Sequence, residues 1–114
     1  MKDIQKTFAM VIGAIFLLIG IIGFFNDPIL GIFHVNLLHN IVHLVTGVLF
    51  LGAAFGGFAR VMNKWFGLVY LLVGIIGLFG VLTFLEVQAG FADADNLLHI
   101  VLGIVIAGVG WFAK

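Results

Sequence analysis

The chain has 114 residues, of which 64% are apolar and 9% are charged, and its formal net charge is zero. So few charged side chains cannot cover the surface of a water-soluble domain of this length, which excludes the soluble globular class. The neutral charge balance also lacks the basic stripe of a nucleic-acid-binding protein. Because the chain has no cysteine, disulfides, iron–sulfur clusters and cysteine zinc sites are excluded within it.

Charged residues divide the sequence into four apolar runs. In chain order, these lie near Thr7–Phe25, Leu37–Phe58, Trp65–Leu85 and Asn96–Ala113. Each run is close to the roughly 20 residues that cross a hydrocarbon core of about 30 Å as a helix. Helix is the expected form because lipid offers no partner to free backbone groups. The sequence therefore predicts an all-α integral membrane protein, with four transmembrane helices in a single domain over residues 1–114.

The first apolar run follows Lys2 and could be mistaken for a secretory signal peptide. Its apolar stretch is longer than the h-region of a signal peptide, and the sequence FFNDP at residues 24–28 contains no small-residue cleavage site. We therefore expect a retained first helix.

The positions of the basic residues predict the orientation in the membrane. They lie before the first run, between the second and third runs, and at the C-terminus: Lys2, Lys6, Arg60, Lys64 and Lys114. The two other connections carry only acidic charges, which are Asp27, Glu86, Asp93 and Asp95. By the positive-inside rule, both termini and the connection that holds Arg60 and Lys64 are cytoplasmic.

The two halves of the chain carry the same pattern. FLLIGIIGFF at residues 16–25 matches YLLVGIIGLF at 70–79, and NIVHLVTG at 40–47 matches NLLHIVLG at 96–103. Because the matches keep their order, we infer an internal duplication of about residues 7–58 and 62–113. Each unit holds two helices, so both units enter the membrane from the same side. The sequence thus predicts two tandem helical hairpins, related by a pseudo-twofold axis along the membrane normal that superposes His43 on His99.

The repeated segments place polar residues on one face of the second and fourth helices. At about 100° per residue, two stripes form. One contains Asn36, Asn40, His43, Gly47, Phe50 and Ala54 with His39 at its edge, and the other contains Asn96, His99, Gly103, Ala107 and Gly110 with Asp95 at its margin. Polar groups in lipid are costly and normally face the bundle interior, so we expect the stripes to meet about one to two turns below the outer surface. Asn36 and Asp95 are the expected N-caps of these helices.

At these residues the chain resembles a known family. NLLHNIVHLVTG at residues 36–47 and ADNLLHIVLG at 94–103 are similar to motifs of the small prokaryotic four-helix membrane proteins grouped as domain-of-unknown-function family forty-three eighty-three. The resemblance covers nearly the whole chain. It implies a multi-pass protein of a prokaryotic cell membrane, and it implies no activity.

The polar cluster has a structural interpretation. It comprises Asn36, Asn40, His43, Asn96 and His99. Asn40 and Asn96 would hydrogen-bond to the imidazoles across the two halves, at about 1 kcal/mol per contact. The protein is then a non-catalytic membrane module or an accessory subunit of a larger membrane complex, with the lipid bilayer as its environment. The small-xxx-small pattern from Gly52 to Gly56 is compatible with a homo-oligomer or with packing within the chain.

The same histidines also have ligand-binding interpretations. His39, His43, Asp95 and His99 form a donor set suited to a transition metal such as zinc, copper, nickel or iron. Alternatively, His43 and His99 could be the axial ligands of a b-type haem, although no basic residue near the outer face would meet its propionates. A proton or ion pathway is a further alternative. An enzyme has the least support, because no nucleophile and no acid–base group beyond Asp95 accompanies the histidines.

Overall fold

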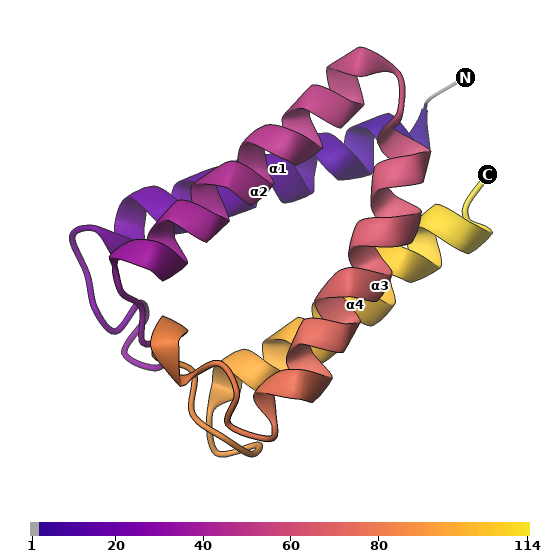
Figure 1. The fold of residues 1–114 in the computed structure, drawn as a ribbon. Coiled ribbons are helices and arrows are strands. Elements are labelled where there is room, and N and C mark those ends of the chain that lie inside the picture. The colour runs from indigo at the N-terminus through magenta and orange to yellow at the C-terminus, as the bar shows by residue number, and fades with distance from the viewer. Residues whose placement is uncertain (1–2) are drawn as a thin grey trace.

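A computed structural model describes residues 3–114 as two helical hairpins (Figure 1). The helices are α1 (Ile4–Gly23), α2 (Leu37–Gly56), α3 (Ala59–Gly77) and α4 (Ala94–Phe112), and a short 3-10 helix, η1 (Thr83–Leu85), precedes α4. All four α-helices are long and apolar enough to cross a membrane, as the sequence predicts. Lys2, one of the predicted orientation signals, lies outside the described residues.

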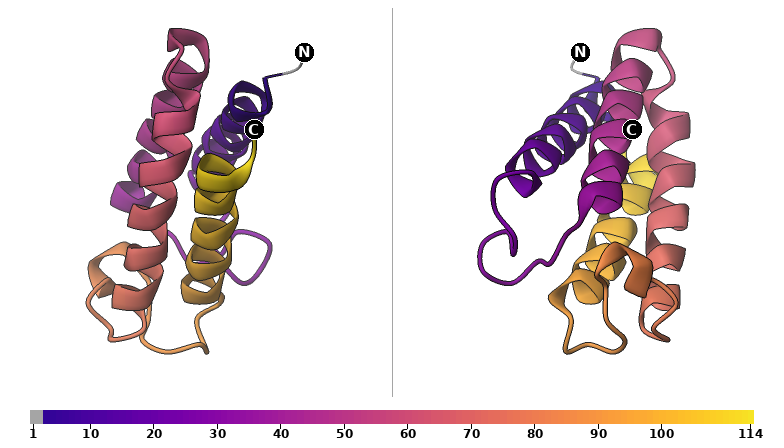
Figure 2. Two further views of the ribbon diagram at one scale, coloured as in Figure 1. Left: turned by 90° about the vertical axis from the view of Figure 1, so that its right-hand side faces the viewer. Right: turned by 60° about the vertical axis from the view of Figure 1, so that its left-hand side comes forward.

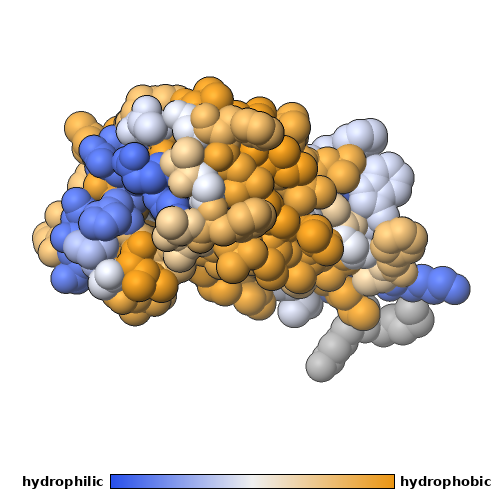
Figure 3. All heavy atoms as spheres, turned by 90° about the horizontal axis from the view of Figure 1, so that it is seen from below, coloured by the Kyte–Doolittle hydropathy of each residue, from blue (hydrophilic) through white to orange (hydrophobic). Residues whose placement is uncertain are grey.

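The bundle has two ends of different character. The segments 24–36 and 78–93 lie together at one end, which we call the loop end (Figures 1 and 2). The two chain ends and the α2–α3 turn lie at the other, which we call the terminal end. Figure 3 shows a largely hydrophobic face, on which hydrophilic residues gather at the loop end. Large apolar side chains such as Leu18, Val48 and Ile104 are exposed between the ends. An apolar belt between two polar ends is the surface that a membrane-spanning bundle requires.

Side-chain caps fix where three helices begin. Asn36 caps α2, because its Oδ1 accepts a hydrogen bond from the N–H of His39 at 2.9 Å, which confirms the predicted cap. The predicted cap at Asp95 is wrong. Asp93 caps α4 instead, and its two carboxylate oxygens accept from the N–H groups of Asp95 at 2.9 Å and Gln88 at 2.8 Å. Asp3 caps α1 in the same way. Each such cap contributes about 1 kcal/mol by satisfying a free N–H of the first turn.

The third helix begins and ends earlier than the predicted run Trp65–Leu85. It starts at Ala59, because Gly57 takes a left-handed conformation (φ 85°) that ends α2 and leaves a connection of only Gly57 and Phe58. Arg60 and Lys64 therefore lie within the first turns of α3, and their predicted place in a loop is wrong. After α3 the chain turns back, although residues 78–85 are nearly all apolar.

Glycines hold the two helices of each hairpin together. A methyl group added at Gly47 of α2 would lie 2.8 Å from the backbone nitrogen of Leu17 in α1. In the second hairpin, a methyl group at Gly74 of α3 would lie 2.8 Å from the backbone nitrogen of Ile100 in α4, and Gly103 meets the backbone of Leu71. The helices of each pair thus approach at backbone distance.

An aromatic core joins the hairpins midway between the two ends. Phe16 of α1 packs edge-on against Tyr70 of α3, with ring centroids 5.4 Å apart. Phe66 of α3 contacts both Phe50 of α2, at 5.0 Å, and Tyr70, at 5.8 Å. Pairs of this kind contribute about 0.5–1.5 kcal/mol beyond the area that they bury. The core leaves the polar residues of the predicted stripes buried toward the loop end.

Candidate functional site

The buried carboxyl group of Asp95 lies between two imidazoles at the loop end. Its Oδ2 is 3.3 Å from Nδ1 of His99, one turn further along α4. The same oxygen is 3.9 Å from Nε2 of His39, which belongs to α2. All three side chains are more than nine-tenths buried, so the contact between α2 and α4 is shielded from solvent.

Backbone carbonyl groups fix the orientation of two of the imidazoles. Nδ1 of His39 lies 2.8 Å from the carbonyl oxygen of Leu85 in η1, and Nδ1 of His99 lies 2.6 Å from the carbonyl oxygen of Asp95. A carbonyl only accepts, so each Nδ1 carries the proton that is donated. His39 therefore directs its other nitrogen, Nε2, at the carboxyl group of Asp95. At 3.9 Å the two atoms are beyond hydrogen-bonding distance, so the pair is an electrostatic contact between the two side chains.

The start of α2 also holds the segment 78–93 of the loop end. Nδ2 of Asn36 donates to the carbonyl oxygen of Phe84 at 2.7 Å, next to the bond between His39 and Leu85. These two bonds fasten η1 to α2, although η1 belongs to the other hairpin. We call the set His39, Leu85, Asp95 and His99 the loop-end joint.

Asn96 does not bond to an imidazole, in contrast to the predicted role. Its Nδ2 lies within hydrogen-bonding distance of three backbone carbonyl oxygens, those of Gly77 (3.2 Å), Gln88 (2.7 Å) and Gly90 (2.9 Å). It therefore holds the end of α3 and the segment 78–93 against the start of α4. The corresponding residue of the first hairpin, Asn40, packs its Oδ1 against Gly23, and this buried oxygen has no hydrogen-bond partner within residues 3–114.

His43 is buried among aromatic rings and makes no polar contact through Nδ1. Its ring lies 4.5 Å from that of His39 and 5.8 Å from that of Phe16. Nδ1 has no hydrogen-bond partner within the described part of the chain. His43 and His99 are 7% and 6% exposed, as inward-facing side chains require. A buried nitrogen without a hydrogen-bond partner lowers the stability of the fold by about 1–3 kcal/mol.

Metal binding and haem binding are predictions from the sequence that the structure does not test. Within residues 3–114, no group of three or more His, Asp or Glu side chains is arranged to hold a metal ion. A series of ring contacts connects His43 through Phe16 and Tyr70 to His99, the other predicted haem ligand. Tyr70 stacks on His99 at 4.2 Å and meets Phe16 at 5.4 Å.

His34, Trp65 and Trp111 lie outside the joint. His34 is exposed in the segment 24–36, with Nδ1 3.7 Å from Oδ1 of Asp27. Trp65 and Trp111 pack edge-on at 5.5 Å on the surface of α3 and α4. Both tryptophans are about half exposed, as residues of an interfacial belt are.

A second polar cluster, which the sequence reasoning missed, lies at the terminal end. Nε2 of Gln5 donates to the carbonyl oxygens of Val109 (2.7 Å) and Ala113 (3.1 Å). Nδ2 of Asn63 donates to Oε1 of Gln5 at 2.9 Å, and Arg60 donates to the carbonyl oxygen of Gly110 at 3.1 Å. Three helices thus meet through side-chain bonds to the last turn of α4.

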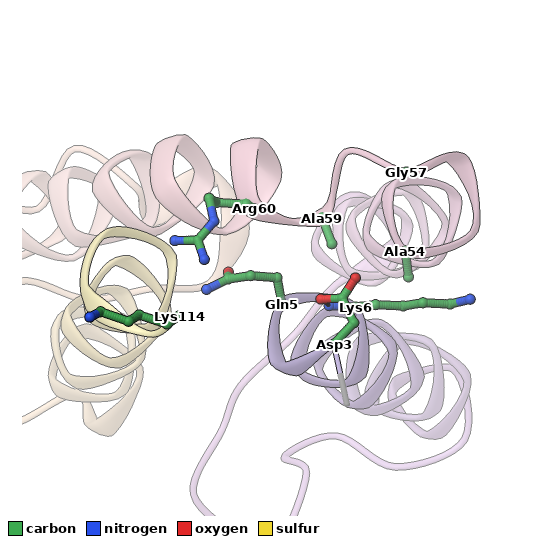
Figure 4. A pocket seen from close by; sticks show the side chains of 8 residues that line it. All are labelled: Asp3, Gln5, Lys6, Ala54, Gly57, Ala59, Arg60 and Lys114. Carbon is green, nitrogen blue, oxygen red and sulfur yellow. Dashed lines mark hydrogen bonds between the residues drawn. The ribbon is translucent and has the colours of Figure 1, made fainter. Parts of the chain in front are cut away.

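Gln5 and Arg60 of this cluster border a cleft of about 380 Å³ (Figure 4). Figure 4 shows Gln5 extending from α1 toward α4, and Arg60 projecting from α3 into the same space. Asp3, Lys6 and Lys114 also line the cleft, which therefore mixes both signs of charge. In the sequence Gln5 and Asn63 stand next to Lys6 and Lys64, so neither is a polar residue within an apolar run.

Comparison with known proteins supplies a family. A protein-family model described as "Domain of unknown function (DUF4383)" matches residues 6–112, which is nearly the whole chain. This confirms the resemblance seen in the two polar motifs. No curated protein and no solved structure matches the chain.

Proposed function

Since the chain belongs to the DUF4383 family of unknown function, we infer its role from the geometry, and we propose a non-catalytic membrane module whose two hairpins are fastened at the loop end by the loop-end joint. The module would stand alone in the lipid bilayer or serve as an accessory subunit of a larger membrane complex. Its polar residues would hold the helices in one arrangement, rather than carry out a reaction.

One observation carries this proposal. The carboxyl group of Asp95 in the second hairpin lies 3.9 Å from the imidazole of His39 in the first, and both are buried. The other nitrogen of His39 is fixed by the carbonyl oxygen of Leu85 at 2.8 Å, so the ring cannot turn away without losing that bond. Inside a membrane such interhelical contacts contribute about 0.6 kcal/mol on average and up to about 1.7 kcal/mol.

A double-mutant cycle tests the joint. His39→Phe keeps a ring of similar size, and Asp95→Leu keeps a side chain of similar volume, so each removes the polar contact with little change in packing. We expect a coupling free energy of about 0.5–1.5 kcal/mol between the two positions, measured by unfolding in mixed micelles.

A matched control is present in the same chain. His34 and Asp27 form an exposed pair at 3.7 Å in the segment 24–36. Because water screens an exposed pair, the cycle of His34→Phe with Asp27→Leu should give about 0–0.5 kcal/mol. A coupling at the buried pair no larger than at this control pair would refute the joint.

We further propose that both chain ends and the turn between α2 and α3 face the cytoplasm. Lys6, Arg60, Lys64 and Lys114 support this orientation, because all four lie toward the terminal end. The loop end, with the joint, would then face outward. This orientation would place a cell-membrane protein with its polar cluster just below the extracytoplasmic surface.

We also propose that the hairpins are a duplicated unit related by a pseudo-twofold axis along the membrane normal. The packing supports it. Gly47 meets Leu17 in the first hairpin, and Gly103 meets Leu71 in the second, which are corresponding positions of the two sequence repeats. Gly23 and Gly77 likewise contact the amides of Asn40 and Asn96.

A further inference from the structure

The apolar part of α3 is shorter than the hydrocarbon core of a bilayer. Although α3 has the length of a spanning helix, its first turns carry Arg60 and Lys64, so its apolar part begins at Trp65. Trp65 packs on Trp111 of α4 at 5.5 Å, and the pair marks the terminal-end boundary as interfacial tryptophans do. Gly77, where α3 ends, lies twelve residues beyond Trp65, or about 18 Å at 1.5 Å per residue. A hydrocarbon core of about 30 Å therefore extends about 12 Å past the end of α3.

The chain that follows α3 supplies the missing apolar length. Residues 78–85 carry no charged side chain, and the hydroxyl group of Thr83 is the only polar side chain among them. Phe79 and Phe84 are 78% and 59% exposed, although they lie in turns and in η1 rather than in a spanning helix. The first charged residue, Glu86, comes directly after this segment. Exposed aromatic side chains with no charge among them require a cover other than water.

Contacts with α2 place the segment at the same depth. The carbonyl oxygen of Leu85 lies 2.8 Å from Nδ1 of His39. His39 is sixteen residues from Phe55 along α2, or about 24 Å at 1.5 Å per residue. The ammonium group of Lys6 lies over the ring of Phe55, at 5.5 Å, and marks the terminal-end boundary there. The end of the segment is therefore about 24 Å from that boundary, within a hydrocarbon core of about 30 Å.

Polar side chains satisfy backbone carbonyl groups at both ends of this segment. Nδ2 of Asn36 donates to the carbonyl oxygen of Phe84 at 2.7 Å, and His39 donates in the same way to Leu85. Nδ2 of Asn96 lies 3.2 Å from the carbonyl oxygen of the last residue of α3. In water such carbonyl groups bond to solvent and need no side chain. Hydrocarbon offers no partner, so non-helical backbone at membrane depth must be satisfied within the protein, as it is here.

We propose that residues 78–85 form a re-entrant segment embedded in the lipid leaflet at the loop end, with Phe79 and Phe84 against acyl chains and water beginning at Glu86. The apolar belt of the bundle continues onto these rings without an intervening charge, which favours lipid as their cover. The inference rests on the proposed membrane module. It depends neither on which end faces the cytoplasm nor on the coupling at the loop-end joint.

The lack of cysteine in the chain allows a direct test, because single cysteines can be introduced and spin-labelled one at a time. Phe79→Cys and Phe84→Cys are labelled with a nitroxide, reconstituted in phosphatidylcholine vesicles and measured by EPR power saturation with two relaxing agents. Molecular oxygen dissolves in hydrocarbon, whereas a neutral nickel chelate stays in water. The ratio of the two accessibilities therefore reports whether lipid or water surrounds the label.

Two positions of matched exposure calibrate this ratio. Val48, in the middle of α2, is 59% exposed, and the side chain of His34 in the segment 24–36 is also 59% exposed. Val48→Cys should report lipid and His34→Cys should report water. We expect the labels at Phe79 and Phe84 to give the high oxygen ratio of Val48, severalfold above the ratio of His34. Because all four side chains are exposed, each labelled variant should keep the melting temperature of the parent protein.

Three results would count against the proposal. A ratio at Phe79 or Phe84 equal to that of His34 would overturn the re-entrant segment and leave the membrane module intact. Low accessibility to both agents at Phe79 and Phe84 would show a protein contact, such as a second copy of the chain, and would overturn the segment as well. A water-like ratio at Val48 would refute the membrane module and the segment together.

Discussion

Replacing Gly47 with alanine should push α1 and α2 apart. The added methyl group would lie 2.8 Å from the backbone nitrogen of Leu17 and 2.8 Å from the carbonyl oxygen of Gly13. Cβ atoms essentially never approach other heavy atoms closer than 3.0 Å, so the helices must separate by at least 0.2 Å, and by 0.6 Å to restore ordinary van der Waals contact at 3.4 Å. Both neighbours are backbone atoms, which cannot move aside as a flexible side chain can.

The same helix contains the control that isolates this effect. At Gly52 an added methyl group meets nothing within 4 Å. Alanine is the better helix former by about 0.5–1 kcal/mol at either position, so this gain cancels when the two variants are compared. The difference that remains is the cost of overpacking, about 1–3 kcal/mol.

The free energy of unfolding, measured by circular dichroism during titration of mixed micelles with a denaturing detergent, gives both values. We expect Gly47→Ala to be about 1–3 kcal/mol less stable than Gly52→Ala. If the hairpins are equivalent, Gly103→Ala should be less stable than Gly108→Ala in α4 by a similar free energy. A methyl group added at Gly103 meets the backbone of Leu71, whereas one added at Gly108 meets nothing within 4 Å. Equal stability of Gly47→Ala and Gly52→Ala would show that α1 and α2 are not packed at backbone distance.

Two further predictions concern orientation and metal. A reporter fused after Lys114 should be active in the cytoplasm and one inserted in the segment Glu86–Ala94 should be active outside, and a cytoplasmic signal from the inserted reporter would contradict the proposed orientation. Because the loop-end joint needs no ion, a chelator should leave the melting temperature unchanged and added zinc should not raise it. A rise with one equivalent of zinc, lost in His39→Phe and His99→Phe, would favour the metal alternative, since a ligand of the folded state stabilises it by mass action.

The four helices and their buried faces were accessible from the sequence because hydropathy and helical period are local signals. Asn36 was assigned correctly as a cap since a capping residue bonds within its own first turn. Asp95 was not, because Asp93, two residues earlier, offers the same chemistry and also bonds to Gln88. A pattern of polar residues does not say which of two neighbouring carboxylates will cap.

The limits of α3 and the partners of the buried amides could not be read from the sequence. The segment from Leu78 to Leu85 is nearly as apolar as the helix before it. The turn at Gly80 (φ 79°) is held by a later residue, because the N–H of Gly90 donates to the carbonyl oxygen of Leu78. Asn96 bonds to carbonyl groups of three separate residues, which only the folded segment brings together. Asn63 stands where the first repeat has Ala9, so it is not part of the repeated pattern.

The meeting of α1 with the last turn of α4 gives this chain a nearly closed path. Gln5 lies within hydrogen-bonding distance of the carbonyl oxygen of Ala113, at 3.1 Å, while the connection between the hairpins is only the exposed pair Gly57 and Phe58. Permuted proteins are tolerated where the old ends are neighbours and the new ends fall in an exposed turn. A chain that starts at Phe58, runs through α3 and α4, passes over a short linker and finishes with α1 and α2 would keep every contact within each hairpin. The order in which the two hairpins leave the ribosome is therefore free to change without altering the bundle that they form.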